Sequence, residues 1–133
     1  DTAPPEISTL SLPDALPIFV SMLKREVLPA ALRFQGELGQ AASATAAAGV
    51  PCADTKAQLK AVVDLVTQWR EATAAVEKAE RQHFESSEKH ARHIRDKLLP
   101  AMVEARRVSD TLEELIPDDV WPLPRYAEML FVR

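Results

Sequence analysis

Apolar residues recur at alternating spacings of three and four along most of the chain, the pattern of amphipathic helices. The pattern becomes helical from Phe19 and predicts a first helix over about residues 19–48. Gly49 and Pro51 then end it, because glycine suits the position after a helix and proline cannot continue one. The apolar stripe of this helix comprises Val27, Ala31, Phe34, Leu38, Ala41, Thr45 and Ala48.

A second stripe predicts a helix over about residues 54–84. Asp54 or Thr55 is the expected N-cap, and Gln58 would complete a capping box with Thr55. The stripe weakens after Ala79, so we place the next turn near residues 84–87, with Ser86 or Ser87 as the following cap. One continuous helix from about residue 54 onward is the alternative. The stripe comprises Leu59, Val62, Val66, Trp69, Thr73 and Val76.

The third stripe is the most regular and predicts a helix over about residues 87–115. Three amphipathic helices with short connections favour an all-α fold, an antiparallel three-helix bundle over residues 19–116. The stripe comprises Ala91, Ile94, Leu98, Ala101, Ala105, Val108, Leu112 and Leu115.

The first and third helices share a short repeat. Residues 24–30 (KREVLPA) match residues 95–101 (RDKLLPA), and each copy places a proline inside a helical pattern. An interior proline removes a hydrogen bond and kinks the helix at a cost of about 3 kcal/mol. We therefore predict kinks at Pro29 and Pro100. Because the first and third helices of such a bundle run parallel, both kinks are expected at one level, where they would bend the bundle to follow a partner's surface.

The two ends of the chain differ from the helical middle. Residues 1–18 contain four prolines and no helical period, so they are expected to be either an unstructured leader or a segment not native to the protein. The second interpretation rests on residues 6–18, which resemble translated sequencing-adapter tails. No function is assigned to this segment.

Residues 117–133 form the second unusual end. Three prolines prevent a helix from running through the first part of this segment. Chain termini are usually polar and frayed, whereas this one carries many large apolar side chains. It is therefore predicted to be an extended docking tail that is buried against the bundle, the rest of the protein or both. The docking residues are Trp121, Leu123, Tyr126, Met129, Leu130 and Phe131.

Composition agrees with this organisation. The 133 residues suffice for one core, and only 5% aromatic residues and 3 glycines favour helices over sheets. The net charge of −4 gives no reason to expect a nucleic-acid or membrane partner. No apolar run approaches the roughly 20 residues of a membrane span. A single cysteine, Cys52, fits a reducing compartment, so the expected location is the cytoplasm.

The histidines are the first candidates for metal chemistry. His83, His90 and His93 lie within eleven residues, and Glu80 and His83 form one Glu-x-x-His turn. Carboxylate metal sites in helical bundles need two such turns and further glutamates on facing helices. The stretch is therefore interpreted as a solvated charged surface, and no metal ligand is predicted.

Other candidates give no reaction chemistry. Asp118 and Asp119 follow a proline, where acids commonly stabilise a turn. Cys52 has no neighbour in sequence that would favour a thiolate. The three glycines match no phosphate-binding loop. No catalytic or cofactor-binding residue is predicted.

The tail also carries a family resemblance. Asp118-Asp119-x-Trp-Pro-x-Pro-x-Tyr-x-x-x-Leu-Phe, ending at Phe131, resembles the C-terminus of type III glutamine synthetases. Residues 28–35 resemble the first helix of that family's C-terminal region. Residues 98–102, with Arg106 and residues 112–113, resemble its last long helix. The likeness extends over roughly residues 19–131.

Members of that family join ammonia to glutamate with ATP and a divalent metal, magnesium or manganese, and assemble as stacked hexameric rings. Their metal, nucleotide and glutamate residues lie upstream of such a region, so none is assigned to this chain. The resemblance implies a structural, oligomerisation domain, inactive alone, of a glutamate–ammonia ligase. Its partners would be the catalytic domain of the same polypeptide and neighbouring subunits of a homo-oligomer. A stand-alone helical interaction module and a small carboxylate metal-binding bundle are the alternatives.

Overall fold

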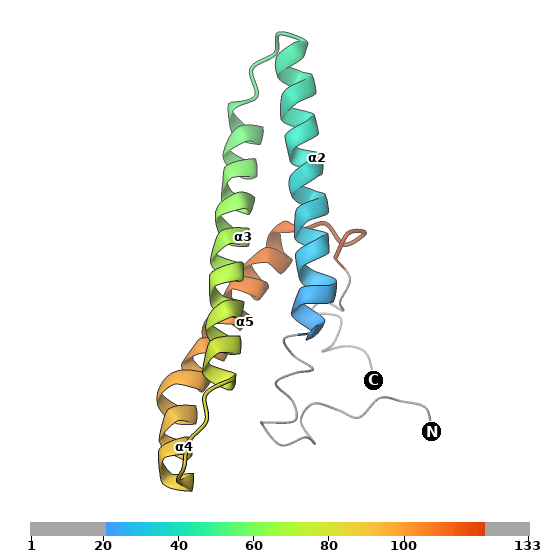
Figure 1. Cartoon of the computed structure of the whole chain (residues 1–133). Coiled ribbons are helices and arrows are strands. Elements are labelled where there is room, and N and C mark those ends of the chain that lie inside the picture. The colour runs from blue at the N-terminus through green and yellow to red at the C-terminus, as the bar shows by residue number, and fades with distance from the viewer. Residues whose placement is uncertain (1–20, 122–133) are drawn as a thin grey trace, which may run out of the picture.

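The computed structural model describes residues 21–121, and over this range the chain is helical, with no strand. A π-helical turn, η2 (Leu23–Val27), leads into α2 (Leu28–Ala47). The second segment is α3 (Ala53–Glu80). The third comprises α4 (Ser87–His93), a second π-helical turn η3 (Ile94–Leu98) and α5 (Leu99–Leu115) (Figure 1). The expectation of an all-helical protein with three helical segments is confirmed for these residues.

The central element of the packing is α3. Both α2 and α5 pack against it, and η3 contacts it as well. Figure 1 shows α2 beside α3, while α5 crosses α3 obliquely. The end of the α2–α3 pair that carries residues 48–52 therefore extends beyond α5.

The buried face of α3 follows its predicted stripe. Val62, Val66, Trp69, Thr73 and Val76 are all buried, as the spacing of three and four requires. Thr73 is the one buried polar residue among those described, and its hydroxyl donates to the carbonyl of Trp69 at 2.9 Å. The helix therefore satisfies its own buried hydroxyl.

The stripe of α2 is correct for its first half and wrong for its second. Val27, Ala31, Phe34 and Leu38 are buried, but the next buried residue is Ala42, whereas Ala41 is exposed. An α-helix turns once in 3.6 residues, so a stripe drawn at a mean of 3.5 drifts off the buried face. Thr45 is half-buried and Ala48 exposed, because this end of α2 lies beyond the reach of α5.

The start of α3 differs from the prediction. Its N-cap is Cys52, whose side chain makes no capping hydrogen bond, so neither Asp54 nor Thr55 is the cap and the capping box is absent. Asp54 instead lies inside the first turn, where its charge still favours the helix N-terminus.

The end of α3 also differs. The helix stops at Glu80, four residues before the expected boundary at 84, and non-helical residues up to Ser86 separate it from α4. The alternative of one continuous helix from residue 54 is therefore wrong. Ser86 is the N-cap of α4, as one of the two expected candidates, and its hydroxyl accepts from the Lys89 amide at 3.2 Å.

A π-helical turn precedes each helical proline. The Leu28 amide donates to the Leu23 carbonyl, and the Leu99 amide donates to the Ile94 carbonyl, one residue further back than in an α-helix. Pro29 and Pro100 come directly after these two amides. Since a proline ring clashes with the carbonyl four residues earlier, the wider turn accommodates it. The structure thus locates a helix irregularity at both prolines, while the predicted bends remain predictions.

One hydrophobic cluster unites the three segments, and Trp121, the first predicted docking residue, belongs to it. The other five docking residues, Leu123, Tyr126, Met129, Leu130 and Phe131, lie outside the described residues, as do residues 1–18. The fully buried large side chains of the cluster are Trp69, Leu112, Ile116, Val27, Val62, Val76 and Val108.

Candidate functional site

The first candidate site is the turn that follows α5. The amides of Val120 and Trp121 both donate to the Pro117 carbonyl, at 3.0 and 2.9 Å. This tight turn contains Asp118 and Asp119, which confirms their interpretation as turn residues. It directs Val120 and Trp121 back into the core, where Trp121 is only 8% exposed. Trp121, the last residue that the structure describes, therefore lies in the core.

The second candidate is the C-terminal end of α3, where both π-helical turns converge. Lys24 Nζ of η2 lies 2.7 Å from Glu77 Oε2. On the other side, His93 Nε2, directly before η3, lies 2.8 Å from the Ala79 carbonyl oxygen. Because Glu77 and Ala79 are two residues apart on α3, the two π-helical turns lie at one level of the molecule.

His93 links α4 to α3. A carbonyl oxygen only accepts hydrogen bonds, so Nε2 of His93 must carry the proton and donate. Ala79 lies in the last turn of α3, where carbonyl groups lack partners within the helix. The imidazole therefore acts as a C-terminal cap supplied by a different helix.

Phe84 completes the connection between the two helices. Its ring lies against His93 with centroids 4.7 Å apart and stacks on His90 at 5.9 Å. Two of the three histidines considered for metal binding thus pack on one aromatic ring, and His83 is exposed. No three or more His, Cys, Asp or Glu side chains within residues 21–121 are placed to hold a metal ion.

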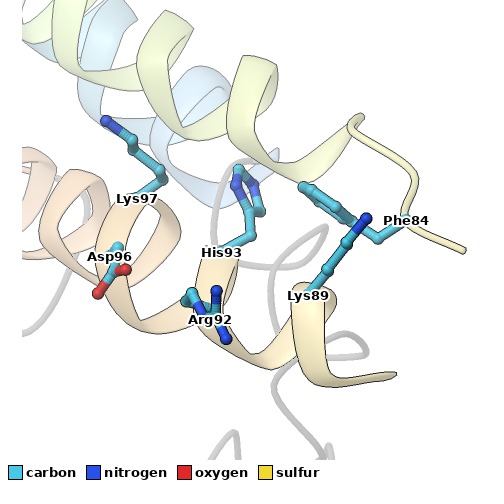
Figure 2. A pocket seen from close by; sticks show the side chains of 6 residues that line it. All are labelled: Phe84, Lys89, Arg92, His93, Asp96 and Lys97. Atoms are coloured by element: carbon cyan, nitrogen blue, oxygen red, sulfur yellow. The ribbon is translucent and has the colours of Figure 1, made fainter. Parts of the chain in front are cut away.

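Next to this cluster is an open pocket of about 370 Å³ (Figure 2). Phe84 lines it from the α3–α4 connection, and the other side chains come from α4 and η3. Asp96 is exposed, and the hydrogen bond from Arg95 lowers the pKa of its carboxyl, so this group is ionised at neutral pH. The lining residues are Phe84, Lys89, Arg92, His93, Asp96 and Lys97.

Sequence reasoning missed this pocket. It treated the stretch that contains His83, His90 and His93 as a solvated charged surface and set the end of α3 four residues too late. The signal that was present is Phe84, a large apolar residue between two charged stretches at a helix boundary. Only the observed path of the α3–α4 connection shows which neighbouring cationic side chains line a pocket with Phe84.

Cys52 is half-buried in the α2–α3 connection. Its thiol lies 3.6 Å from the Ala42 carbonyl oxygen, a weak hydrogen bond that ties the connection to α2. Among residues 21–121 the structure thus assembles no nucleophile–base pair around this thiol.

Comparison with known proteins identifies one short similarity. Over 50 residues, the chain is 40% identical to a type-3 glutamine synthetase of Dictyostelium discoideum. The matched segment spans 38% of this chain and 7% of that protein. The similarity therefore concerns a small part of a much longer relative. It links the chain to that enzyme class only through this short segment.

Two further comparisons bear on the fold and the family. No protein-family model matches the chain, and no solved structure matches it either. Within residues 21–121, none of the helices combines the length and the apolar character that crossing a membrane requires.

Proposed function

We propose that this chain is a C-terminal structural and oligomerisation domain of a type III glutamine synthetase. The observation that carries the proposal is the 40% identity over 50 residues to a type-3 glutamine synthetase, together with the small share, 7%, of that protein that is matched. A helical segment that matches so little of a long relative suits a peripheral domain better than a complete enzyme.

The arrangement of the helices supports a structural role. In this proposal the three segments form an antiparallel bundle around α3, and the prolines after η2 and η3 bend its outer helices at one level. The bend would fit the bundle to the curved surface of a ring-shaped assembly. The partners would be the catalytic domain of the same polypeptide and neighbouring subunits.

The tail is the proposed docking element. The turn at Pro117 sends Val120 and Trp121 into the core, so the tail starts from a fixed point on the bundle. Burial of a large aromatic side chain contributes several kcal/mol, since it removes about 150–250 Å² from water at about 25 cal/mol per Å². Leu123, Tyr126, Met129, Leu130 and Phe131 would add to this contact.

The catalytic steps would take place elsewhere in the enzyme. The ligation of ammonia to glutamate, with ATP and magnesium or manganese, is proposed for the upstream catalytic domain. No residue of this chain is proposed to bind the nucleotide or the metal ion. A cytoplasmic location, which the single cysteine favours, is part of the same proposal.

The test starts with the source DNA upstream of this coding sequence. An intact reading frame encoding a glutamate–ammonia ligase is expected, and the full-length enzyme should then be produced with and without residues 19–133. Light scattering should show a large ring assembly for the intact enzyme and smaller species for the deletion. This chain alone should turn over no ATP. An intact upstream frame without a ligase, or ATP turnover by the isolated chain, would overturn the proposal.

A stand-alone interaction module is the second candidate. Leu99 and Val103 are 42% and 68% exposed, and their spacing of four places them on one face of α5. Such a pair suits a contact with another protein. A complete gene that begins shortly before this chain would favour this candidate over the first.

A further inference from the structure

We propose that the pocket at the α3–α4 connection binds a small anion that carries a flat apolar group. The pocket is lined by Phe84, Lys89, Arg92, His93, Asp96 and Lys97. The proposal is independent of any parent enzyme, because it rests only on the charges and the shape of this pocket.

The charges of the third helical segment point to an anion. Each arginine described there pairs with an acid of the same segment: Arg92 with Glu88, Arg95 with Asp96, Arg106 with Asp110 and Arg107 with Glu104. Lys89 and Lys97 are different, because neither has an ion-pair partner among the described residues. Both of these lysines line the pocket.

The balance of charge in the pocket remains positive when every lining residue is counted. Lys89, Arg92 and Lys97 line the pocket together with a single carboxylate, that of Asp96, and Arg92 is paired with Glu88 outside the lining. This carboxylate accepts a hydrogen bond of 2.9 Å from Arg95, which is not a lining residue, so its charge is already compensated. The protein as a whole carries a net charge of −4, which makes a cationic pocket a local exception.

The apolar part of the ligand is indicated by Phe84. Its ring is held by contacts with His90 and His93, and His93 is itself anchored to the Ala79 carbonyl. Figure 2 shows Phe84 and Lys89 at one end of the pocket, Lys97 at the other and His93 between them. The aromatic wall is therefore fixed before a ligand arrives, which reduces the ordering cost of binding.

Size limits the ligand class. A volume of about 370 Å³ lies near the lower end of the range of about 300–1,000 Å³ for small-molecule pockets. It suits a molecule of one or two rings with a single phosphate or carboxylate. Because the pocket is open to water, the attraction between charges is screened, and binding should weaken as salt is added.

The experiment uses the full chain and three probes, 1-naphthyl phosphate, inorganic phosphate and the neutral 1-naphthol. Amide chemical shifts from NMR would be followed during titration at low salt. We expect 1-naphthyl phosphate to shift the amides of residues 84–97 and to bind more tightly than either of the other two probes. Phosphate alone lacks the ring that packs on Phe84, and the naphthol lacks the charge that the lysines attract.

Substitutions separate the two parts of the site. The double variant Lys89→Gln/Lys97→Gln should weaken binding of 1-naphthyl phosphate by about fivefold, since each exposed ion pair contributes modestly. Phe84→Leu, which keeps an apolar side chain, should reduce the advantage of 1-naphthyl phosphate over phosphate. Lys56→Gln is the matched control, because Lys56 is exposed in the first turns of α3, away from the pocket, and should leave binding unchanged.

Several results would overturn the proposal. These are no saturable shift at residues 84–97 with 1-naphthyl phosphate, an equal response to inorganic phosphate, and undiminished binding in the double lysine variant with unchanged helicity. If Lys56→Gln weakened binding of 1-naphthyl phosphate as much as the double lysine variant does, only the overall charge of the protein would matter. That result would also refute binding in the pocket.

Discussion

His93 Nε2 donates a hydrogen bond of 2.8 Å to the carbonyl oxygen of Ala79, fourteen positions earlier in the chain. The bond joins the last turn of α3 to the segment that follows it. It also orients the imidazole against Phe84, so one side chain fixes both the helix end and the wall of the pocket.

The first prediction concerns this bond. His93→Ala should lower the free energy of unfolding by about 1–3 kcal/mol, because the Ala79 carbonyl loses its partner and Phe84 loses a packing surface. His83→Ala is the control, since His83 is exposed, and should change stability by less than about 0.5 kcal/mol. Urea denaturation followed by circular dichroism measures both. Equal effects of the two substitutions would contradict the role of His93.

The second prediction compares two glycines for which substitution by alanine should change stability in opposite directions. Gly49 has φ of +80° after the end of α2, whereas Gly36 lies within that helix. An added Cβ would meet no atom within 4 Å at either position, so only the backbone decides the outcome. Gly49→Ala should destabilise by about 1 kcal/mol, and Gly36→Ala should stabilise by about 0.5–1 kcal/mol. Thermal unfolding of both variants measures the two changes in stability. If both variants were stabilised, or both destabilised, the different backbone roles of the two glycines would be refuted.

Much of the fold was predictable from periodicity. The stripe of α3 from Val62 to Val76 is buried as expected, because a long helix with partners on two sides is constrained along its length. The stripe of α2 failed after Leu38, because a stripe drawn at a mean spacing of 3.5 drifts from Ala42 to Ala41 and because α5 does not extend along this end of the α2–α3 pair. A sequence pattern identifies the apolar face of a helix, but the length over which another helix covers it is a tertiary property.

The candidate sites were less predictable. The proline repeat indicated irregular helices at Pro29 and Pro100, yet the π-helical turns before them follow from hydrogen bonding that no residue pattern specifies. The bond between His93 and Ala79 depends on where α3 ends, and no glycine or proline marks that boundary. The pocket beside Phe84 was missed for the same reason.

The third prediction tests the prolines. Pro29→Ala and Pro100→Ala each restore a backbone donor and remove a ring clash, so each should convert its π-helical turn to α-helix. The free energy of unfolding of this chain should rise, by up to about 3 kcal/mol for each. If the bends serve assembly, the double variant should weaken oligomerisation of the full enzyme. Assembly as good as that of the parent would refute this shape argument, whatever happens to stability.

The fourth prediction concerns Trp69, which is 2% exposed and whose indole Nε1 is buried with no hydrogen-bond partner among the described residues. Trp69→Ala should cost about 3–5 kcal/mol, because it leaves a large cavity at the centre of the core. Trp69→Phe should cost much less, since it keeps an aromatic ring and removes the unsatisfied donor. Denaturant titration of both variants provides the comparison. A phenylalanine variant as unstable as the alanine variant would show that the indole has an essential polar partner.

The fifth prediction concerns the start of the docking tail. Trp121 is buried beside Ile116 and Val120, at the end of the turn formed around the Pro117 carbonyl. Trp121→Ala should release the segment after this turn, so limited proteolysis should cleave the chain after residue 117 several times faster, while the helical circular dichroism signal persists. Leu99→Ala is a suitable control, because it removes an exposed apolar side chain from α5 without touching the turn. Unchanged cleavage of the Trp121 variant would mean that this side chain does not hold the tail, and loss of the helical signal would mean that Trp121 supports the whole bundle instead.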